Sequence, residues 1–281
     1  LLKNIFEYIK TEYVAFFADD DFAITSNFDK GIDFLENNKN YSFVCGKAYL
    51  LSINNKVYGD INWIENYKQG SAEEENIYQR LENYIKNYFV AEYGISRSIQ
   101  MKERWKLIFE NKFDNLTSEY FNCFMTIIQG KVKKLDHLFL VRQSHNLMTS
   151  RINLTHKEWL NNIFIQKHML NLKNILLVFC QKKINHFKVN KFSNTYNTIV
   201  NEIKISINQK KDNNKVNSVN YIKIILSKIK IYKKIKYIIK NIFILIGILK
   251  IYNTNIYTLK NRKHIDFICI KDVFSIIEKK I

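Results

Sequence analysis

A short apolar run, Tyr13 to Ala18, stops at three consecutive aspartates, Asp19 to Asp21. A continuous apolar run of this length predicts a strand buried on both faces, as in a parallel or mixed sheet. Strand-like and helix-like patterns then alternate to about residue 145, so we expect an α/β fold in this part of the chain. The aspartates would lie at the carboxyl end of a strand, where ligands gather in open α/β sheets.

The other elements expected in this part follow from apolar spacing and from capping residues. A helix over 71–88 is expected to carry Glu73, Glu74 and Glu75 in its first turn, where the helix dipole favours acids. A second helix, over 120–128, is expected to be opened by Thr117-Ser118-Glu119 and closed by Gly130. Further helices are predicted over 1–11, 28–37 and 98–109, and strands over 41–53, 90–95 and 132–142, with a turn at Asn54-Asn55 leading into 56–58.

Composition excludes several classes of protein. The chain has no proline and 7 glycines, which rules out collagen-like, proline-rich and glycine-rich low-complexity chains. The four cysteines lie 57 or more residues apart and form no CxxC pair. This spacing argues against zinc knuckles and a small disulfide scaffold, and it indicates reduced thiols in a cytosolic protein.

The net charge of +18 is distributed unevenly along the chain. Residues 1–150 carry 18 basic and 20 acidic side chains, whereas residues 151–281 carry 26 basic and 6 acidic ones. This asymmetry predicts two functional zones, of which the basic one faces an anionic partner.

The aspartate run has two interpretations. Asp19 and Asp21 are two residues apart, so both can face one side of an extended turn while Asp20 faces away. Two hard oxygen ligands, completed by phosphate oxygens and waters, suit Mg²⁺ or Mn²⁺. The alternative is a solvated acidic turn that caps the next helix, which an isolated run of three aspartates favours.

The surroundings of this run resemble a known family. The segment Tyr13–Phe22, the helix after it and Tyr41–Gly46 resemble the metal-binding segment of GT-A glycosyltransferases, in particular the family-2-like group of polysaccharide-building enzymes. In these proteins an apolar strand ends in a DxD sequence, and its metal bridges the diphosphate of a sugar nucleotide. Asp19 and Asp21 match the DxD positions, so the resemblance implies that Asp19, Asp20 and Asp21 bind the cofactor. The resemblance continues more loosely through Arg80-Leu81, Tyr88, Arg97, Ser118–Tyr120, Gly130–Val132 and Val141–Gln143.

The resemblance also implies a general base. In the family, an acid that opens a helix lies across the acceptor site and takes the proton of the acceptor hydroxyl. Glu119 matches this position, although the family's common Glu-Asp pair reads Ser118-Glu119 here. The alternative for Glu119 is an ordinary acid in the first turn of a helix. Asp114 and Glu110 are the reserve candidates for the base.

Four further side chains are metal or phosphate candidates. His145 stands where many GT-A enzymes carry a histidine that completes the metal shell, and His137 is the fallback. A lone histidine is more often a structural hydrogen-bonding residue, so this alternative stays open. Arg97 and Arg142 are candidates for phosphate contact, with structural or surface roles as the alternative for each.

The expected domain organisation follows. Residues 1–150 would form the GT-A catalytic domain, with a Rossmann-like mixed sheet. The DxD strand comes about one helix after Leu1, so the resemblance implies that the first, nucleotide-binding part of such a domain lies upstream. A mainly helical basic region follows, with a helical extension over 151–206, a linker over 207–220 and a basic amphipathic helical region over 221–281.

This last region has two expected structures. Apolar residues from Ile222 to Leu249 follow helical steps, with most lysines opposite them. The longest uncharged run, Asn241 to Leu249, is far shorter than a membrane span. We expect either a helix lying on an anionic membrane or a helix packed on the catalytic domain. Nucleic-acid binding ranks lower because Arg151 and Arg262 are the only arginines in the basic half and no recognition motif occurs.

The sequence therefore predicts an enzyme. The predicted enzyme is a glycosyltransferase that depends on Mg²⁺ or Mn²⁺. It would transfer a hexosyl or related group from a nucleotide sugar to a hydroxyl of a glycan or lipid-linked acceptor, in cell-surface polysaccharide synthesis. Resemblance to the family-2-like group implies inversion at the anomeric carbon. The expected location is the cytoplasm, including the inner face of the cell membrane. The alternative is a non-enzymatic basic protein that binds a membrane surface or nucleic acid.

Overall fold

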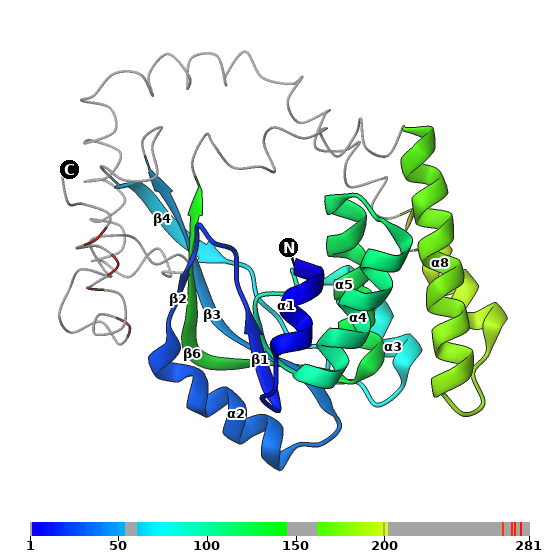
Figure 1. The fold of residues 1–281 in the computed structure, drawn as a ribbon, viewed down its shortest axis with the longest axis horizontal. Coiled ribbons are helices and arrows are strands. Elements are labelled where there is room, and N and C mark those ends of the chain that lie inside the picture. Colours follow the sequence, from blue (N-terminus) through cyan, green and yellow to red (C-terminus); the bar gives the residue numbers. More distant parts are fainter. Residues whose placement is uncertain are drawn as a thin grey trace, which may run out of the picture.

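The computed structural model describes residues 2–53, 61–144, 162–198, 200–201, 266, 271, 273 and 276. The architecture is α/β, as predicted, with a mixed sheet whose long strands are flanked by helices (Figure 1). The helices are α1 (Leu2–Tyr8), α2 (Phe28–Asn37), α3 (Ile77–Lys86), α4 (Ser98–Asn111), α5 (Asn115–Gln129) and α8 (Ile163–Lys183), with a 3₁₀ turn η1 (Thr25–Asn27) and a helical segment over 189–198. The strands are β1 (Tyr13–Phe16), β2 (Phe22–Ala23), β3 (Tyr41–Ile53), β4 (Ile61–Tyr67), β5 (Gly94–Arg97) and β6 (Lys131–Ser144).

Strand β3 is the centre of the sheet. It pairs in parallel with β6 and antiparallel with β4 and β5. Strand β1 continues the sheet beyond β5, and β2 pairs antiparallel with β6, so the order is β1-β5-β3-β6-β2. The β2–β6 pairing sets Phe22 opposite Val141. It thereby brings the aspartate turn, which directly precedes β2, beside the end of β6.

Helices pack on both faces of the sheet because successive side chains of a strand point to opposite faces. Phe43 and Cys45 of β3 belong to a large core cluster with α3, α4, α5 and α8. Val44, between them, belongs to a separate cluster with Leu35 of α2 and with Phe139. The longest strand therefore contributes to two cores at once.

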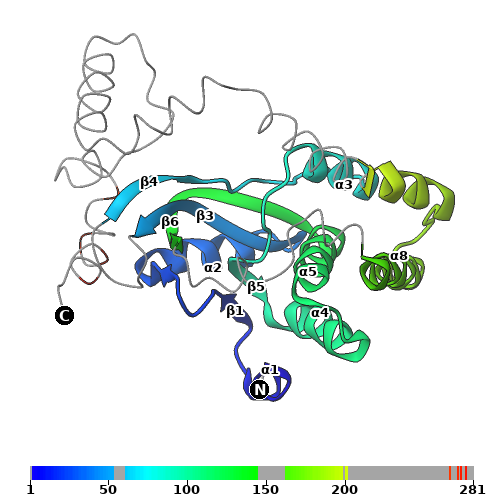
Figure 2. The ribbon, with the colours of Figure 1, turned by 90° about the horizontal axis from the view of Figure 1, so that it is seen from above.

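Helix α5 is the centre of the larger core. All its residues from Tyr120 to Ile128 are buried, which requires partners on every side of the helix. Helices α3, α4 and α8 contact it, and Figure 2 shows α8 on the side of α5 away from the sheet. Leu172, Leu176 and Cys180 of α8 are fully buried in this cluster. The helical segment predicted after residue 150 thus shares its core with the α/β part.

Several predicted elements are confirmed: α2, β3, α4, β6 and helices within 151–200. The expectation that the strand of Tyr13 is buried on both faces is wrong. Ala15 is exposed and the rest of β1 is half-buried, because β5 is its only sheet neighbour in the described part of the chain. The strand expected over 90–95 lies at Gly94–Arg97, and β4 was not predicted.

Two predicted helix starts are also wrong. Helix α3 begins at Ile77 rather than at residue 71, because the side chain of Asn76 accepts from the backbone N–H groups of Tyr78 and Gln79 and caps the helix there. Helix α5 begins at Asn115 after an equivalent cap by Asp114, so Thr117-Ser118-Glu119 do not open it. Gly130 follows α5 in an extended conformation, with Ser42 close to its Cα.

Parts of the basic half lie outside the described residues. These are residues 151–161, 199 and 202–206 of the expected helical extension, the expected linker over 207–220 and all of 221–281 except four residues, so the predictions for them stay predictions. The turn expected at Asn54-Asn55 also lies outside the described residues. In the described ranges, no helix is both long and apolar enough to cross a membrane.

Candidate active site

The three aspartates form a tight turn between β1 and β2. The backbone N–H of Asp21 donates to the carbonyl of Ala18 at 3.2 Å. Asp19 is exposed and Asp20 is half-buried, whereas the side chain of Asp21 has 0% exposure. The turn does not cap α2, whose N-cap residue is Asn27. For Asp21, the interpretation as a solvated capping residue is therefore wrong.

Asp21 is held by the end of β6. The backbone N–H of Gln143 donates to Asp21 Oδ1 at 3.0 Å, and Nε of Arg142 lies 3.4 Å from Oδ2. Oδ2 itself is buried and makes no hydrogen bond. Burial raises the pKa of Asp21 to about 6, against the opposing effects of Arg142 and of the Gln143 N–H. The Asp21 carboxyl is thus an anchored group with one oxygen still able to accept.

Arg142 is enclosed by two tyrosines. Its guanidinium carbon lies 5.1 Å from the ring centroid of Tyr67 and 4.7 Å from that of Tyr93. Its Nη1 donates to Tyr67 Oη at 2.6 Å, and 17% of the side chain is exposed. Cation–π contacts of this kind favour the charged form of the arginine in a partly desolvated place. Arg142 therefore presents a fixed positive charge beside Asp21.

Two glutamates lie near this arginine. Glu119, in the second turn of α5, accepts from Tyr88 Oη at 3.1 Å. Glu92, which precedes β5, is 8% exposed and accepts from Nδ2 of Asn122 at 3.0 Å. Asn122 is three residues after Glu119 on the same helix, so both side chains project from one face of α5. Glu92 and Glu119 are therefore neighbours.

The pKa of Glu92 is shifted by burial and by the charges around it. Burial raises the pKa of Glu92 to about 7, and the negative charge of Glu119 is the next contribution in the same direction. The charges of Arg104 and Arg142 oppose this rise. A carboxyl group with such a pKa exchanges its proton near neutral pH.

Arg104 fixes Asn122 in place. It is fully buried, its Nε donates to Oδ1 of Asn122 at 2.8 Å, and its Nη2 donates to Oγ of Ser96 at 2.9 Å. Its Nη1 donates to Oε1 of Gln129 at 2.7 Å. Because Oδ1 of Asn122 is engaged by Arg104, its amide nitrogen is directed at Glu92.

These side chains form one cluster, which we call the acid–arginine cluster: Asp21, Tyr67, Glu92, Tyr93, Glu119 and Arg142. The charges of Glu119 and Arg142 both act on Tyr67, Tyr93 and Glu92, which places the glutamates and the arginine around the same two phenols. Burial raises the pKa of Tyr67 to about 12, so this phenol is neutral at physiological pH. The cluster joins residues from β4, β6, α5 and the loops before β2 and β5.

The structure brings Asp21, Glu119 and Arg142 into this cluster but not the reserve candidates. Asp114 caps α5 and lies 3.1 Å from Nδ1 of His168. Glu110 is exposed on α4, and His137 is exposed on β6. His145 lies outside the described residues.

Arg97 has a structural role elsewhere. Its Nη2 donates to the carbonyl of Leu35 at 2.5 Å and its Nε to that of Tyr41 at 3.3 Å. It thereby ties the end of α2 to β3. These contacts support the structural role that the sequence analysis gave as the alternative to phosphate contact.

Sequence reasoning missed Glu92, Tyr67 and Tyr93. Glu92 carried a signal, since it is a carboxylate inside an otherwise apolar run expected to be a strand, Val90 to Ile95. Buried carboxylates are rare unless paired, so such a position is a candidate functional residue. Tyr67 carried no signal, because its place depends on β4.

In the described part of the chain, no group of three or more His, Cys, Asp or Glu side chains is arranged to hold a metal ion. Comparison of the chain with models of known protein families gives no match, and neither does comparison with curated protein sequences. The observations that bear on function are therefore the fold and the acid–arginine cluster.

Proposed function

We propose that the chain is a metal-dependent glycosyltransferase of the GT-A type. It would transfer a sugar from a nucleoside diphosphate sugar to a hydroxyl acceptor, in glycan or polysaccharide synthesis, with inversion at the anomeric carbon. The observation that carries this proposal is the acid–arginine cluster. It joins the aspartate turn at Asp21 to a potential base at Glu119 through the cation Arg142.

The donor set at the turn fits a divalent cation. Oδ2 of Asp21 makes no hydrogen bond and lies 3.4 Å from Nε of Arg142, and Asp19 is exposed two residues before Asp21. Carboxylate oxygens are the ligands that Mg²⁺ and Mn²⁺ prefer, and a site with few protein ligands is typical where substrate phosphates supply the others. Asp19 and Asp21 would hold the ion, which when bound offsets negative charge on the diphosphate.

Each residue of the cluster then has a role. Arg142 faces the diphosphate with a positive charge that Tyr67 and Tyr93 hold in place. Glu119 accepts the proton of the acceptor hydroxyl while that oxygen bonds to the anomeric carbon. The bond from this carbon to the diphosphate oxygen breaks, and its electron pair leaves with the diphosphate. Fixed charges that meet charge developing in the reaction are the main source of such catalysis.

Glu92 is a positioning residue in this scheme. Two neighbouring carboxyl groups do not both ionise readily, so the proton is held by the more buried of the two. Burial raises the pKa of Glu92 to about 7, so near neutral pH this carboxyl holds a proton for part of the time and then adds no negative charge beside Glu119. Glu119 is the base of the proposed reaction, and Glu92 adjusts the charge next to it.

The test is a calorimetric titration of UDP into the full-length natural protein with and without Mn²⁺. We expect binding only with Mn²⁺, and a loss of at least about tenfold in affinity in Asp21→Asn, which keeps the size of the side chain but removes its charge. Asp33→Asn, at an exposed position of α2, is the matched control and should bind as the unaltered chain does. Thermal unfolding checks that each variant is folded.

Three results would overturn the proposal: UDP affinity that is the same without Mn²⁺, affinity unchanged in folded Asp21→Asn, or no UDP binding by the folded full-length protein. The alternative function, a basic protein on a membrane surface or nucleic acid, depends on residues 221–281, nearly all of which lie outside the described part. It predicts binding to anionic vesicles or nucleic acid that needs no metal and is lost in salt.

A further inference from the structure

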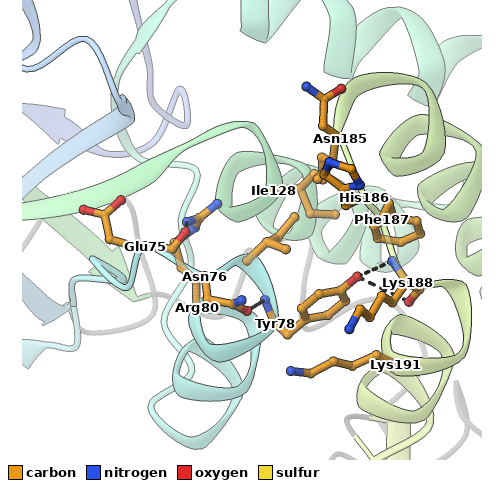
Figure 3. Close-up of a pocket in the computed structure, with 12 residues that line it drawn as sticks. Glu75, Asn76, Tyr78, Arg80, Ile128, Asn185, His186, Phe187, Lys188 and Lys191 are labelled. Atoms are coloured by element: carbon orange, nitrogen blue, oxygen red, sulfur yellow. Dashed lines mark hydrogen bonds between the residues drawn. The ribbon is translucent and has the colours of Figure 1, made fainter.

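A pocket of about 450 Å³ lies apart from the acid–arginine cluster. Its walls come from the start of α3 and from the turn that follows α8, with Ile128 of α5 between them (Figure 3). None of the six residues of the acid–arginine cluster lines it. The volume is within the range of sites for small organic molecules, about 300 to 1,000 Å³.

The charged side chains that line the pocket are mostly basic. Arg80, Lys188 and Lys191 contribute three positive charges, and Glu75 is the one carboxylate among the lining residues that the structure describes. Glu75 is itself ion-paired with Lys131. The lining residues that the structure describes therefore carry more positive than negative charge.

Arg80 is the most constrained of these cations. It is 7% exposed, and its Nε and Nη1 donate to the backbone carbonyls of Ile127, Glu74 and Glu75 at 2.9, 2.7 and 3.2 Å. Its Nη2 makes no hydrogen bond to any residue in the described ranges. Burial lowers its pKa, against the opposing effect of the charges of Glu74 and Glu75. An anion placed at Nη2 would further stabilise the charged form.

Tyr78 holds the opposite wall in place. Its hydroxyl accepts from the backbone N–H of Lys188 at 2.6 Å and lies 3.3 Å from the carbonyl of the same residue. Its ring stacks on Phe187, with centroids 6.0 Å apart, and Nζ of Lys191 lies 4.8 Å from its centroid. Figure 3 shows the side chains of Lys188, which follows the turn, and of Lys191, in the helical segment over 189–198, extending toward Tyr78. The contacts of Tyr78 thus hold the segment that carries both lysines against α3.

We propose that this pocket binds a phosphorylated small molecule of about the size of a monosaccharide phosphate. A phosphate monoester carries about two negative charges near neutral pH, which match a site with three cations better than one carboxylate does. Lys188 and Lys191 contact the phosphate group, Arg80 adds positive charge on the opposite wall, and Ile77, Ile128 and Ile184 contact the carbon skeleton. The proposal is independent of the proposed glycosyltransferase activity.

Isothermal titration of glucose 1-phosphate into the full chain, beside unphosphorylated glucose, tests this site. We expect saturable binding of glucose 1-phosphate and none of glucose. The combined change Lys188→Gln and Lys191→Gln should weaken binding about tenfold or more, since hydrogen bonds to charged groups are the strong ones. Lys182→Gln, at an exposed position in the last turn of α8 that does not line the pocket, is the matched control and should bind as before.

The lysines are exposed, so their replacement leaves the fold intact, which thermal unfolding verifies. The same variants leave the acid–arginine cluster unchanged. Glucose 1-phosphate binding that survives both substitutions would therefore place the phosphate elsewhere and overturn the proposal. Absence of binding to the folded chain, or equal binding of glucose, would overturn it as well.

Discussion

Replacing Glu92 by glutamine is expected to reduce the pH dependence of stability. Glu92 is 8% exposed, and burial together with the charge of Glu119 raises its pKa from 4.5 to about 7. The folded protein therefore keeps a proton on Glu92 in a pH range where the unfolded chain has lost it. In Glu92→Gln the amide oxygen can still accept from Asn122, and the group no longer ionises.

The sign follows from proton binding. Between pH 4.5 and about 7 the folded state binds more protons than the unfolded state, so the free energy of unfolding falls as the pH rises. A shift of this size corresponds to about 3 kcal/mol, present below the unfolded pKa and lost as the pH passes through the folded one. Asp21, whose pKa is also raised, acts in the same direction in both proteins, so their difference isolates Glu92.

The assay is urea unfolding of both proteins at several values between pH 4.5 and 8. Relative to the unaltered protein, Glu92→Gln should gain about 3 kcal/mol across this range, with most of the gain between pH 5 and 7. Glu36→Gln, at an exposed position of α2, is the control and should show a small constant difference. Parallel stability curves for Glu92→Gln and the unaltered protein would refute the argument that Glu92 is protonated in the fold.

Substitutions at three other positions test strand packing, helix capping and the hydrogen bonds of Arg104. Gly46→Ala should cost about 3 kcal/mol in urea unfolding, because its Cβ would lie 2.2 Å from the backbone oxygen of His137; an unchanged midpoint would contradict the β3–β6 contact. Asp114→Ala should lower the free energy of unfolding by about 1 kcal/mol, because it removes the cap of α5. Asp114→Asn should keep most of this stability, since an asparagine side chain can also cap; equal losses for the two variants in thermal unfolding would argue against capping. Arg104→Ala should cost about 3 kcal/mol or more, since it leaves Asn122, Ser96 and Gln129 without their partner; a loss below about 1 kcal/mol would show that the network contributes little.

Local patterns were sufficient to predict the elements whose apolar residues repeat regularly. The run from Tyr41 to Ile53 and the helix from Phe28 to Asn37 have the predicted bounds. The acids Glu73 and Glu75 show where local reasoning fails. Dipole preference favoured a helix there, but Glu73 binds Lys133 and accepts from Tyr41 Oη, and these residues are distant in sequence.

The candidate site was predictable only in part for the same reason. Asp21 and Glu119 were identified from the sequence, and the structure places both in the acid–arginine cluster. Their common neighbour Arg142 was one candidate among several, because its contact with Asp21 depends on the register of β2 against β6. Tyr67 and Glu92 reach the cluster through tertiary packing that no spacing rule contains.

The parallel pairing of β3 with β6 has a consequence for the order of folding. Tyr41 pairs with Lys131, about 90 residues later, and all of α3, α4 and α5 lie between them. Contacts among helices close in sequence form faster than a pairing that must close so long a loop. We therefore expect α3, α4 and α5 to pack together first and β6 to pair with β3 late in folding. Only that last docking unites Asp21 with Arg142, so a partly folded chain would hold its helical core and have no site.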